Sequence, residues 1–295
     1  MKGIGVGDVV SRLLTSVVFF VLVFSGLSLS AQSVSKAEEL YQRTDYQGSL
    51  ALLAKNSADS ATLNLIGRNY FMLGDFKKAS DYFQKAVDAD PGNSDFALWL
   101  GRSFGRRAET GNPLLAPSYA SRTREWLEKA VALNGKNQEA LSDLFDYYLQ
   151  APGFLGGGYD KAANLAQRIA TVDPAEGYFA RARLAEKRQE YSSAEEQLRR
   201  AAESAPRQVG RVLDLAKFLA NRGRNQESDA LFARAEKMAP DTPKVWFAHA
   251  DVLIKQKRNL PEAKRLLERY LQSTTTPEDP SKQEAQQLLK KASGA

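Results

Sequence analysis

Hydrophobic and small residues recur at steps of three and four positions along residues 60–93. This spacing places them on one face of a helix. The pattern is interrupted at Gly74 and ends at Pro91, which cannot continue a helix. The stretch therefore predicts two short helices joined by a turn, with these residues on the apolar faces: Leu63, Ile66, Gly67, Tyr70, Phe76, Ala79, Phe83 and Ala86.

The same pattern returns along most of the chain. A degenerate unit is expected over residues 35–55, and a charged helix within residues 277–295 is expected to cap the last unit, because terminal units have one face without a neighbour. Long alternation of β-branched residues is absent, so the sequence predicts an all-α chain. We expect full units at residues 60–93, 94–137, 138–174, 175–208, 209–242 and 243–276.

Two consecutive units are longer than the others. The second unit has about ten extra residues around Glu109–Ser118, and the third has a glycine-rich turn at Ala151–Gly158. Both lie between the two helices of their unit, so we expect two neighbouring loops on one edge of the stack. Insertions of this kind often build a binding face, although they would also serve simply to cover the ends of the hairpins. Their candidate residues are apolar side chains that a simple turn does not need, namely Leu114, Leu115, Phe154 and Leu155.

The period of about 34 residues, with its small and aromatic positions, resembles the tetratricopeptide repeat (TPR) family over residues 35–291. The resemblance implies a right-handed α-solenoid of about six TPR helical hairpins, plus the degenerate N-terminal unit and the C-terminal capping helix. It also implies a concave groove that binds peptides or proteins. The expected function is therefore that of a non-enzymatic scaffold that assembles a complex.

The first 31 residues differ from the rest of the chain. Lys2 and Arg12 precede an uncharged apolar run over residues 13–29, and small residues follow at Ser30 and Ala31. A basic start, an apolar run and small residues are typical of a secretory signal peptide. We therefore expect an exported protein of a bacterial envelope, periplasmic or secreted. The alternative is that residues 13–29 remain as a membrane anchor, since their length is near the lower limit for spanning a bilayer.

Composition argues against most enzyme chemistry. The chain has no cysteine and a single histidine, His249, so thiolate chemistry is excluded and a histidine-based metal site or catalytic triad is disfavoured. The glycines at Gly153–Gly158 are followed by Tyr159 instead of lysine and are preceded by a predicted helix, unlike a phosphate-binding loop. The net charge of +6 comes without a lysine- or arginine-rich run, so nucleic acid is not an expected partner. We expect no catalytic residue, metal or cofactor.

The groove candidates come from the resemblance, because the first helix of each TPR unit lines the groove. Four of the six ninth positions are basic: Arg68, Arg102, Arg183 and Lys217. A row of cations with interleaved aromatic rings suits a protein or peptide partner of acidic character. The carboxylate clamp of the family is not predicted, because Trp99 and Asp143 stand where it needs asparagine and lysine. The complete set of groove candidates is Asn64, Arg68, Phe71, Trp99, Arg102, Arg106, Phe179, Arg183, Lys217 and Phe247.

The sequence leaves a second class of function open. The stretch Ala151–Ala162 resembles a turn of bacterial periplasmic repeat proteins, among them the accessory component of tripartite periplasmic transporters. This resemblance implies a periplasmic accessory protein that holds a small apolar or acidic ligand. The four apolar residues of the two insertions would then stand at the mouth of its binding site.

Overall fold

The computed structural model describes residues 32–53 and 59–294, and the regular structure within these ranges is entirely helical. The predicted all-α class is confirmed. The predicted signal segment, residues 1–31, lies outside the described residues. No described helix is both long and apolar enough to cross a bilayer.

The chain divides into two units, with the boundary after Ala89, and each is described by itself. In the N-terminal unit α3 and α4 pack as a hairpin. At their closest approach a Cβ on Gly67 would lie 2.6 Å from the ring of Phe83, so the glycine is what lets the two helices meet. Residues 32–42 are also helical, and the helices that follow are α2 (Tyr46–Leu53), α3 (Ser60–Met72) and α4 (Phe76–Ala89).

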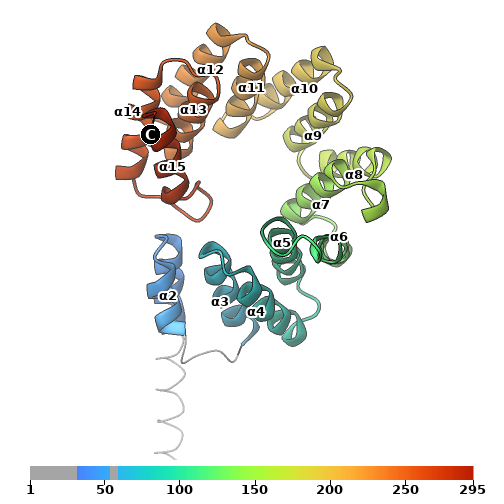
Figure 1. Cartoon of the computed structure of the whole chain (residues 1–295). Helices are drawn as coiled ribbons and strands as arrows, with labels where there is room; N and C mark the ends of the chain where they lie inside the picture. The colour runs from blue at the N-terminus through green and yellow to red at the C-terminus, as the bar shows by residue number, and fades with distance from the viewer. Residues whose placement is uncertain (1–31, 54–58, 295) are drawn as a thin grey trace, which may run out of the picture. The chain divides into compact units, whose positions relative to one another are not determined.

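The C-terminal unit is a run of helices, each of which packs against the next (Figure 1). Some first helices of neighbouring hairpins also touch, as α5 touches α7 and α7 touches α9. The elements are α5 (Ser94–Thr110), α6 (Ala116–Leu133), α7 (Gln138–Gln150), the 3-10 turn η1 (Gly153–Leu155), α8 (Tyr159–Val172), α9 (Pro174–Lys187), α10 (Tyr191–Ser204), α11 (Val209–Asn221), α12 (Asn225–Met238), α13 (Pro243–Lys255), α14 (Leu260–Gln272) and α15 (Lys282–Ala292).

Short polar side chains start several first helices. Asn93, Asn137 and Asp173 each accept hydrogen bonds from backbone N–H groups of the first turn of α5, α7 and α9 respectively. These bonds satisfy donors that have no partner inside the helix. Asp173 also ends α8, so α8 and α9 are joined by one residue. The connections between hairpins are therefore short and fixed by local hydrogen bonds.

The turn inside the regular hairpins needs a left-handed backbone. The second residue after the first helix has positive φ in α3–α4 (Gly74, 80°), α9–α10 (Gln189, 61°), α11–α12 (Gly223, 77°) and α13–α14 (Lys257, 53°). Glycine adopts this conformation without steric cost, whereas Gln189 and Lys257 adopt it at a cost of about 1 kcal/mol. These four hairpins therefore share one turn geometry.

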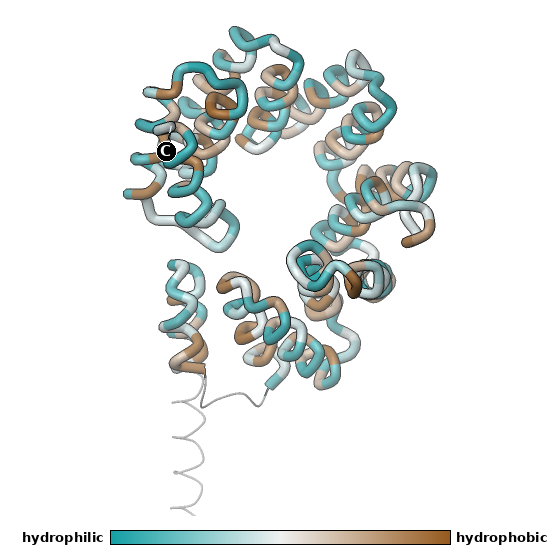
Figure 2. Tube along the Cα trace, viewed as in Figure 1, coloured by the Kyte–Doolittle hydropathy of each residue, from teal (hydrophilic) through white to brown (hydrophobic). Residues whose placement is uncertain are grey.

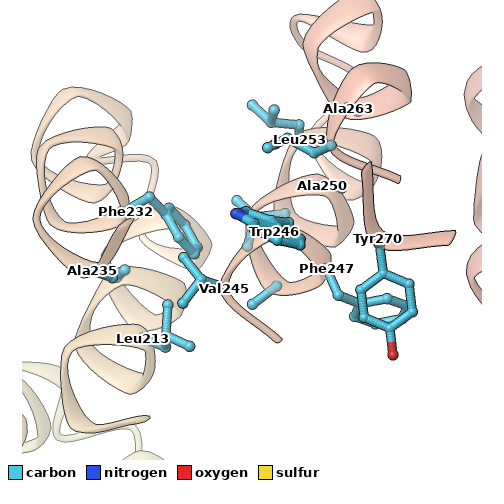
Figure 3. Close-up of a cluster of buried hydrophobic side chains, with 14 of the residues drawn as sticks. Leu213, Phe232, Ala235, Val245, Trp246, Phe247, Ala250, Leu253, Ala263 and Tyr270 are labelled. Carbon is cyan, nitrogen blue, oxygen red and sulfur yellow. The ribbon is translucent and has the colours of Figure 1, made fainter. Parts of the chain in front are cut away.

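The core lies between the helices of successive hairpins. Brown, hydrophobic segments alternate with teal ones along each helix in Figure 2, as expected for helices with one buried stripe. Figure 3 shows the cluster at α11–α14, where Phe232 of α12 meets Trp246 and Leu253 of α13 and all three are buried. The last helix, α15, packs on α13 and α14 with Ala285 fully buried.

The extra residues of the second hairpin are mostly helical, which differs from the loop expected over Glu109–Ser118. Helices α5 and α6 have 17 and 18 residues, against 13 in α3, α7, α11 and α13 and 14 in α4, α8, α10 and α12. Each arm is therefore longer by about one turn. Only residues 111–115 connect them, so the second hairpin is elongated and has a short tip.

Candidate functional site

Charged side chains on the first helices of the C-terminal unit form hydrogen-bonded pairs between neighbouring hairpins. Arg102 on α5 reaches α7, where its Nε lies 2.5 Å from Asp143 Oδ2 and its Nη1 lies 2.8 Å from Glu139 Oε2. This is a two-armed ion pair of the kind that the planar guanidinium favours. We call this set and its continuation the charged ladder, made of Arg102, Glu139, Asp143, Asp146, Glu176, Arg183, Arg211 and Asp214.

The charged ladder continues from α7 to α11. Arg183 on α9 donates to Asp146 on α7, with 2.8 Å between Nη1 and Oδ1. Arg211 on α11 donates to Glu176 on α9 and also to Asp214 one turn along its own helix, at 3.1 Å. Each ladder arginine is therefore neutralised by carboxylates, at least one of which lies on a neighbouring first helix.

Partial burial shifts the pKa of several ladder groups. Burial raises the pKa of Asp146 above its ordinary value even though Arg183 lies beside it, and burial likewise raises the pKa of Asp214 despite Arg211. For Arg102, burial alone would lower the pKa, but Asp143 and Glu139 outweigh it and the pKa is raised. The ladder is therefore a partly dehydrated network of both signs and not a row of unpaired cations.

The ladder ion pairs whose carboxylate side chains are partly buried should contribute to stability. Asp143→Asn is expected to lower the free energy of unfolding by about 1–2 kcal/mol, because Arg102 loses a charged hydrogen-bond partner. The matched control is Glu139→Gln on the same arginine, whose side chain is 68% exposed against 29% for Asp143. The control should cost less than about 0.5 kcal/mol. Urea unfolding followed by circular dichroism measures both, and equal losses would contradict this ranking.

Two of the predicted aromatic residues lie beside ladder arginines. The guanidinium carbon of Arg102 is 4.9 Å from the centre of the Trp99 ring. Phe179 lies between Arg183 and Arg211, at 5.9 and 4.9 Å from its ring centre. Both rings are partly exposed. Trp99, Arg102, Phe179 and Arg183 therefore all lie on first helices of the C-terminal unit. The two arginines are already paired with carboxylates.

The other groove candidates do not join this set. Phe247 is only 8% exposed and packs against Tyr270 in the core, 5.2 Å between ring centres, so it is not available to a partner. Lys217 is exposed. Arg106 is also exposed and pairs with Glu109.

Three candidates, Asn64, Arg68 and Phe71, belong to the N-terminal unit. Asn64 is partly buried. The Arg68 guanidinium lies 4.5 Å from the centre of the Tyr41 ring, and Phe71 makes an edge contact with Phe76 at 5.2 Å. Their described contacts are internal to this unit.

Sequence reasoning missed the acidic partners of the arginines. Asp143, Asp146 and Glu176 are separated from their arginines by 41, 37 and 35 residues, which is about one repeat. The signal was present in the sequence as opposite charges at first-helix positions of consecutive units. These opposite charges predict a groove whose arginines are paired with carboxylates of the neighbouring repeat, instead of a basic groove.

The tip of the elongated hairpin exposes two leucines. Leu114 is 88% exposed and Leu115 is 47% exposed. The tip backbone is held by hydrogen bonds from Leu114 N to Asn112 Oδ1 and from Leu115 N to Asn112 O, both 2.9 Å. A Cβ on Gly111 would lie 2.5 Å from the carbonyl oxygen of Arg107, so the glycine permits this turn.

The glycine-rich turn exposes Phe154, whose side chain is 82% exposed, while Leu155 is partly buried. The carbonyl of Leu155 accepts hydrogen bonds from Arg124 Nη1 on α6, 3.1 Å, and from the Tyr147 hydroxyl, 2.9 Å. Gly156 has φ of 86°, and a Cβ there would overlap the Arg124 guanidinium. The turn is therefore anchored to the side of α6.

The two insertions are connected through α6. Arg124, which holds the glycine-rich turn, lies eight residues after Ala116, the first residue of the helix. This corresponds to about 12 Å along the helix axis. The tip of the elongated hairpin therefore projects past the glycine-rich turn along the same helix.

The only histidine of the chain has a packing role. His249 stacks on Phe232 with 4.4 Å between ring centres and 8° between planes, and its Nε2 is 3.8 Å from Asp229. Burial lowers the pKa of His249 in spite of this carboxylate. Within residues 32–53 and 59–294 no group of three or more histidine, aspartate or glutamate side chains is placed to hold a metal ion.

Comparison with protein families finds the tetratricopeptide repeat twice, at residues 60–93 and 213–281. No curated protein sequence matches the chain. These two regions include α3, α12, α13 and α14, whose hairpins show the regular geometry described above.

Solved structures show the same fold. A TPR protein from Parabacteroides merdae ATCC 43184 is 15% identical, covers 90% of this chain and 98% of its own, and has a TM-score of 0.56. TTC0263, a thermophilic TPR protein of Thermus thermophilus, is 19% identical, with coverage of 64% and 98% and a TM-score of 0.53. Acl4, the assembly chaperone of RpL4, is 15% identical, with coverage of 79% and 99% and a TM-score of 0.50. Repeat pattern, helical hairpins and these similarities agree, and the chain is a tetratricopeptide-repeat protein.

Proposed function

We propose that this TPR protein is an exported scaffold that binds a protein or peptide across the first helices α5, α7, α9 and α11. The observation that carries the proposal is the pair of partly exposed rings, Trp99 and Phe179, each beside arginines whose positions are fixed by carboxylates. Aromatic rings and pre-oriented guanidinium groups are the side chains that supply most of the binding energy in protein interfaces.

The charged ladder changes the kind of partner that we propose. Because Arg102, Arg183 and Arg211 are already paired with carboxylates, the surface offers both signs of charge. An acidic peptide would have to compete with these carboxylates. A segment with apolar anchors and mixed charge fits the surface better.

Export is proposed from the basic start and apolar run of residues 1–31, which fit a signal peptide or an N-terminal anchor. A small-ligand site formed by the inserted residues has less support. Leu114 and Phe154 are almost fully exposed, whereas the residues around a small ligand are largely covered by the pocket walls.

The test is affinity purification with crosslinking from the native envelope. The wild-type chain should retain a partner that Trp99→Ala/Phe179→Ala loses by about tenfold or more, because each substitution removes an aromatic anchor. Tyr191→Ala is the matched control, since Tyr191 on the second helix α10 also lies under an arginine, 3.8 Å from Arg222. It should retain the partner.

Two results would overturn the proposal. Equal capture by the wild-type and the Trp99→Ala/Phe179→Ala chains would show that this surface does not bind the partner. Capture of cytoplasmic proteins alone would remove the exported location.

A further inference from the structure

The elongated hairpin concentrates positive charge. Residues 103–124 contain four arginines and one glutamate, a net charge of +3 in 22 residues, against +6 for all 295. Arg106 and Arg122 are exposed, and Arg107 and Arg124 are partly exposed. This outer part of the hairpin therefore carries an excess of positive charge next to the exposed leucines of its tip, with Arg106 paired to Glu109 and Arg124 lying 3.7 Å from Glu128.

The arginines are held in place by aromatic rings. Arg122 lies 3.8 Å from the centre of the Phe104 ring, and Arg107 lies 4.3 Å from the centre of the Tyr119 ring and donates to its hydroxyl at 2.7 Å. Phe104 and Tyr119 are stacked at 6.2 Å. This packing joins the two extended arms, so the tip is a firm projection that carries Leu114 at its end.

The glycine-rich turn carries a second exposed apolar side chain, Phe154. Its backbone is bonded to Arg124 of the same hairpin, which fixes Phe154 relative to the tip. Leu114 and Phe154 are the two most exposed large hydrophobic side chains in the described parts of the chain. Both side chains protrude, and the bond to Arg124 ties the two segments that carry them to the same helix.

We propose that Leu114, Leu115 and Phe154 dock this protein on an anionic lipid bilayer, with the exposed Arg106 and Arg122 facing the lipid headgroups. Apolar side chains that enter the interface and cations that lie near anionic headgroups are the two components of peripheral membrane binding. The surface is separate from Trp99 and Phe179, so this inference does not depend on the proposed peptide site.

The shape of the surface favours a bilayer over a protein partner. A stable protein interface needs about 800 Å² of complementary surface on each side. Here the apolar side chains stand on two narrow projections, one directly before the start of α6 and one bonded to Arg124, eight residues into that helix. A fluid interface accepts isolated projections without shape complementarity, and the net charge of +3 matches anionic headgroups.

The chain has no cysteine, which permits a site-specific test in the full-length protein. Leu114→Cys, Phe154→Cys and the control Ala233→Cys would each be labelled with an environment-sensitive fluorophore. Ala233 is exposed on α12. Vesicles of phosphatidylcholine with roughly 30 mol% phosphatidylglycerol should shift the emission at 114 and 154 to the blue and leave the label at 233 unchanged.

Substitutions in the full chain separate this docking from any attachment through residues 13–29, because the variants and the wild type share that segment. Leu114→Ser/Phe154→Ser, with both side chains exposed in the wild type, should weaken the vesicle affinity by about tenfold or more relative to the wild type in the same full chain. Arg106→Gln/Arg122→Gln should weaken it as well and reduce its dependence on salt.

Three results would overturn the proposal. The first is an unchanged emission at positions 114 and 154 while the protein sediments with vesicles. The second is equal affinity of the Leu114→Ser/Phe154→Ser and wild-type chains. The third is a blue shift at 114 and 154 produced by a purified protein partner and not by vesicles, which would assign the surface to protein binding.

Discussion

Gly177→Val is expected to lower the free energy of unfolding by about 3 kcal/mol, because it places a branched side chain where two helices touch. Gly177 is in the first turn of α9, which follows α8 after the single residue Asp173. A Cβ at Gly177 would lie 2.5 Å from the Cα of Ala170 and 3.0 Å from its nitrogen. Backbone atoms cannot rotate away as a flexible side chain would, so α8 and α9 would have to separate.

Urea unfolding of the wild type, Gly177→Val and the control Gly210→Ala measures this effect. Gly210 is in the first turn of α11, and a Cβ there meets no atom within 4 Å. The control should be as stable as the wild type or more stable by about 0.5–1 kcal/mol, since alanine restricts the unfolded chain more than glycine does. Equal stability of all three chains would show that α8 and α9 are not in backbone contact at Ala170.

Periodicity was a sufficient guide to the helices of the regular hairpins. Steps of three and four residues locate a buried stripe, and the first helices start directly after capping residues such as Asn93 and Asn137, where side-chain bonds favour a helix start. These signals are local in the sequence. They therefore predict elements whose ends are set by local hydrogen bonds.

The elongated hairpin was misread for an equally local reason. Glycine, asparagine and two prolines between Gly111 and Pro117 indicate a loop. Pro117, however, is the second residue of α6, in the first turn, where the missing N–H of proline costs nothing. A loop signature and a helix start share this composition, and only tertiary packing distinguishes them.

The groove could not be predicted residue by residue, because first helices are covered on more than one side. Phe247 and Phe179 stand at related positions of their units, yet Phe247 packs on Tyr270 of the following helix while Phe179 remains partly exposed beside arginines. A single-sequence period does not show which neighbour covers a given side. Likewise, the charge of Arg102 and Arg183 is plain in the sequence, but the carboxylates that neutralise it come from another repeat.

Phe232→Ala is expected to lower the free energy of unfolding by about 3–5 kcal/mol, since it empties a site in a closely packed core. Phe232 on α12 is 1% exposed and stacks on His249 of α13, so its ring joins two consecutive hairpins. The matched control is the same substitution at Phe154, which is 82% exposed and should change stability by less than about 0.5 kcal/mol. Thermal and urea unfolding of the three chains measure both effects.

A small loss of stability on Phe232→Ala would mean that the α12–α13 contact does not depend on this ring. A large loss of stability on Phe154→Ala would mean that this ring supports the fold. Phe154 would then not be free to enter a bilayer. The same pair of substitutions therefore separates the residues that join the repeats from those that are free to meet another surface.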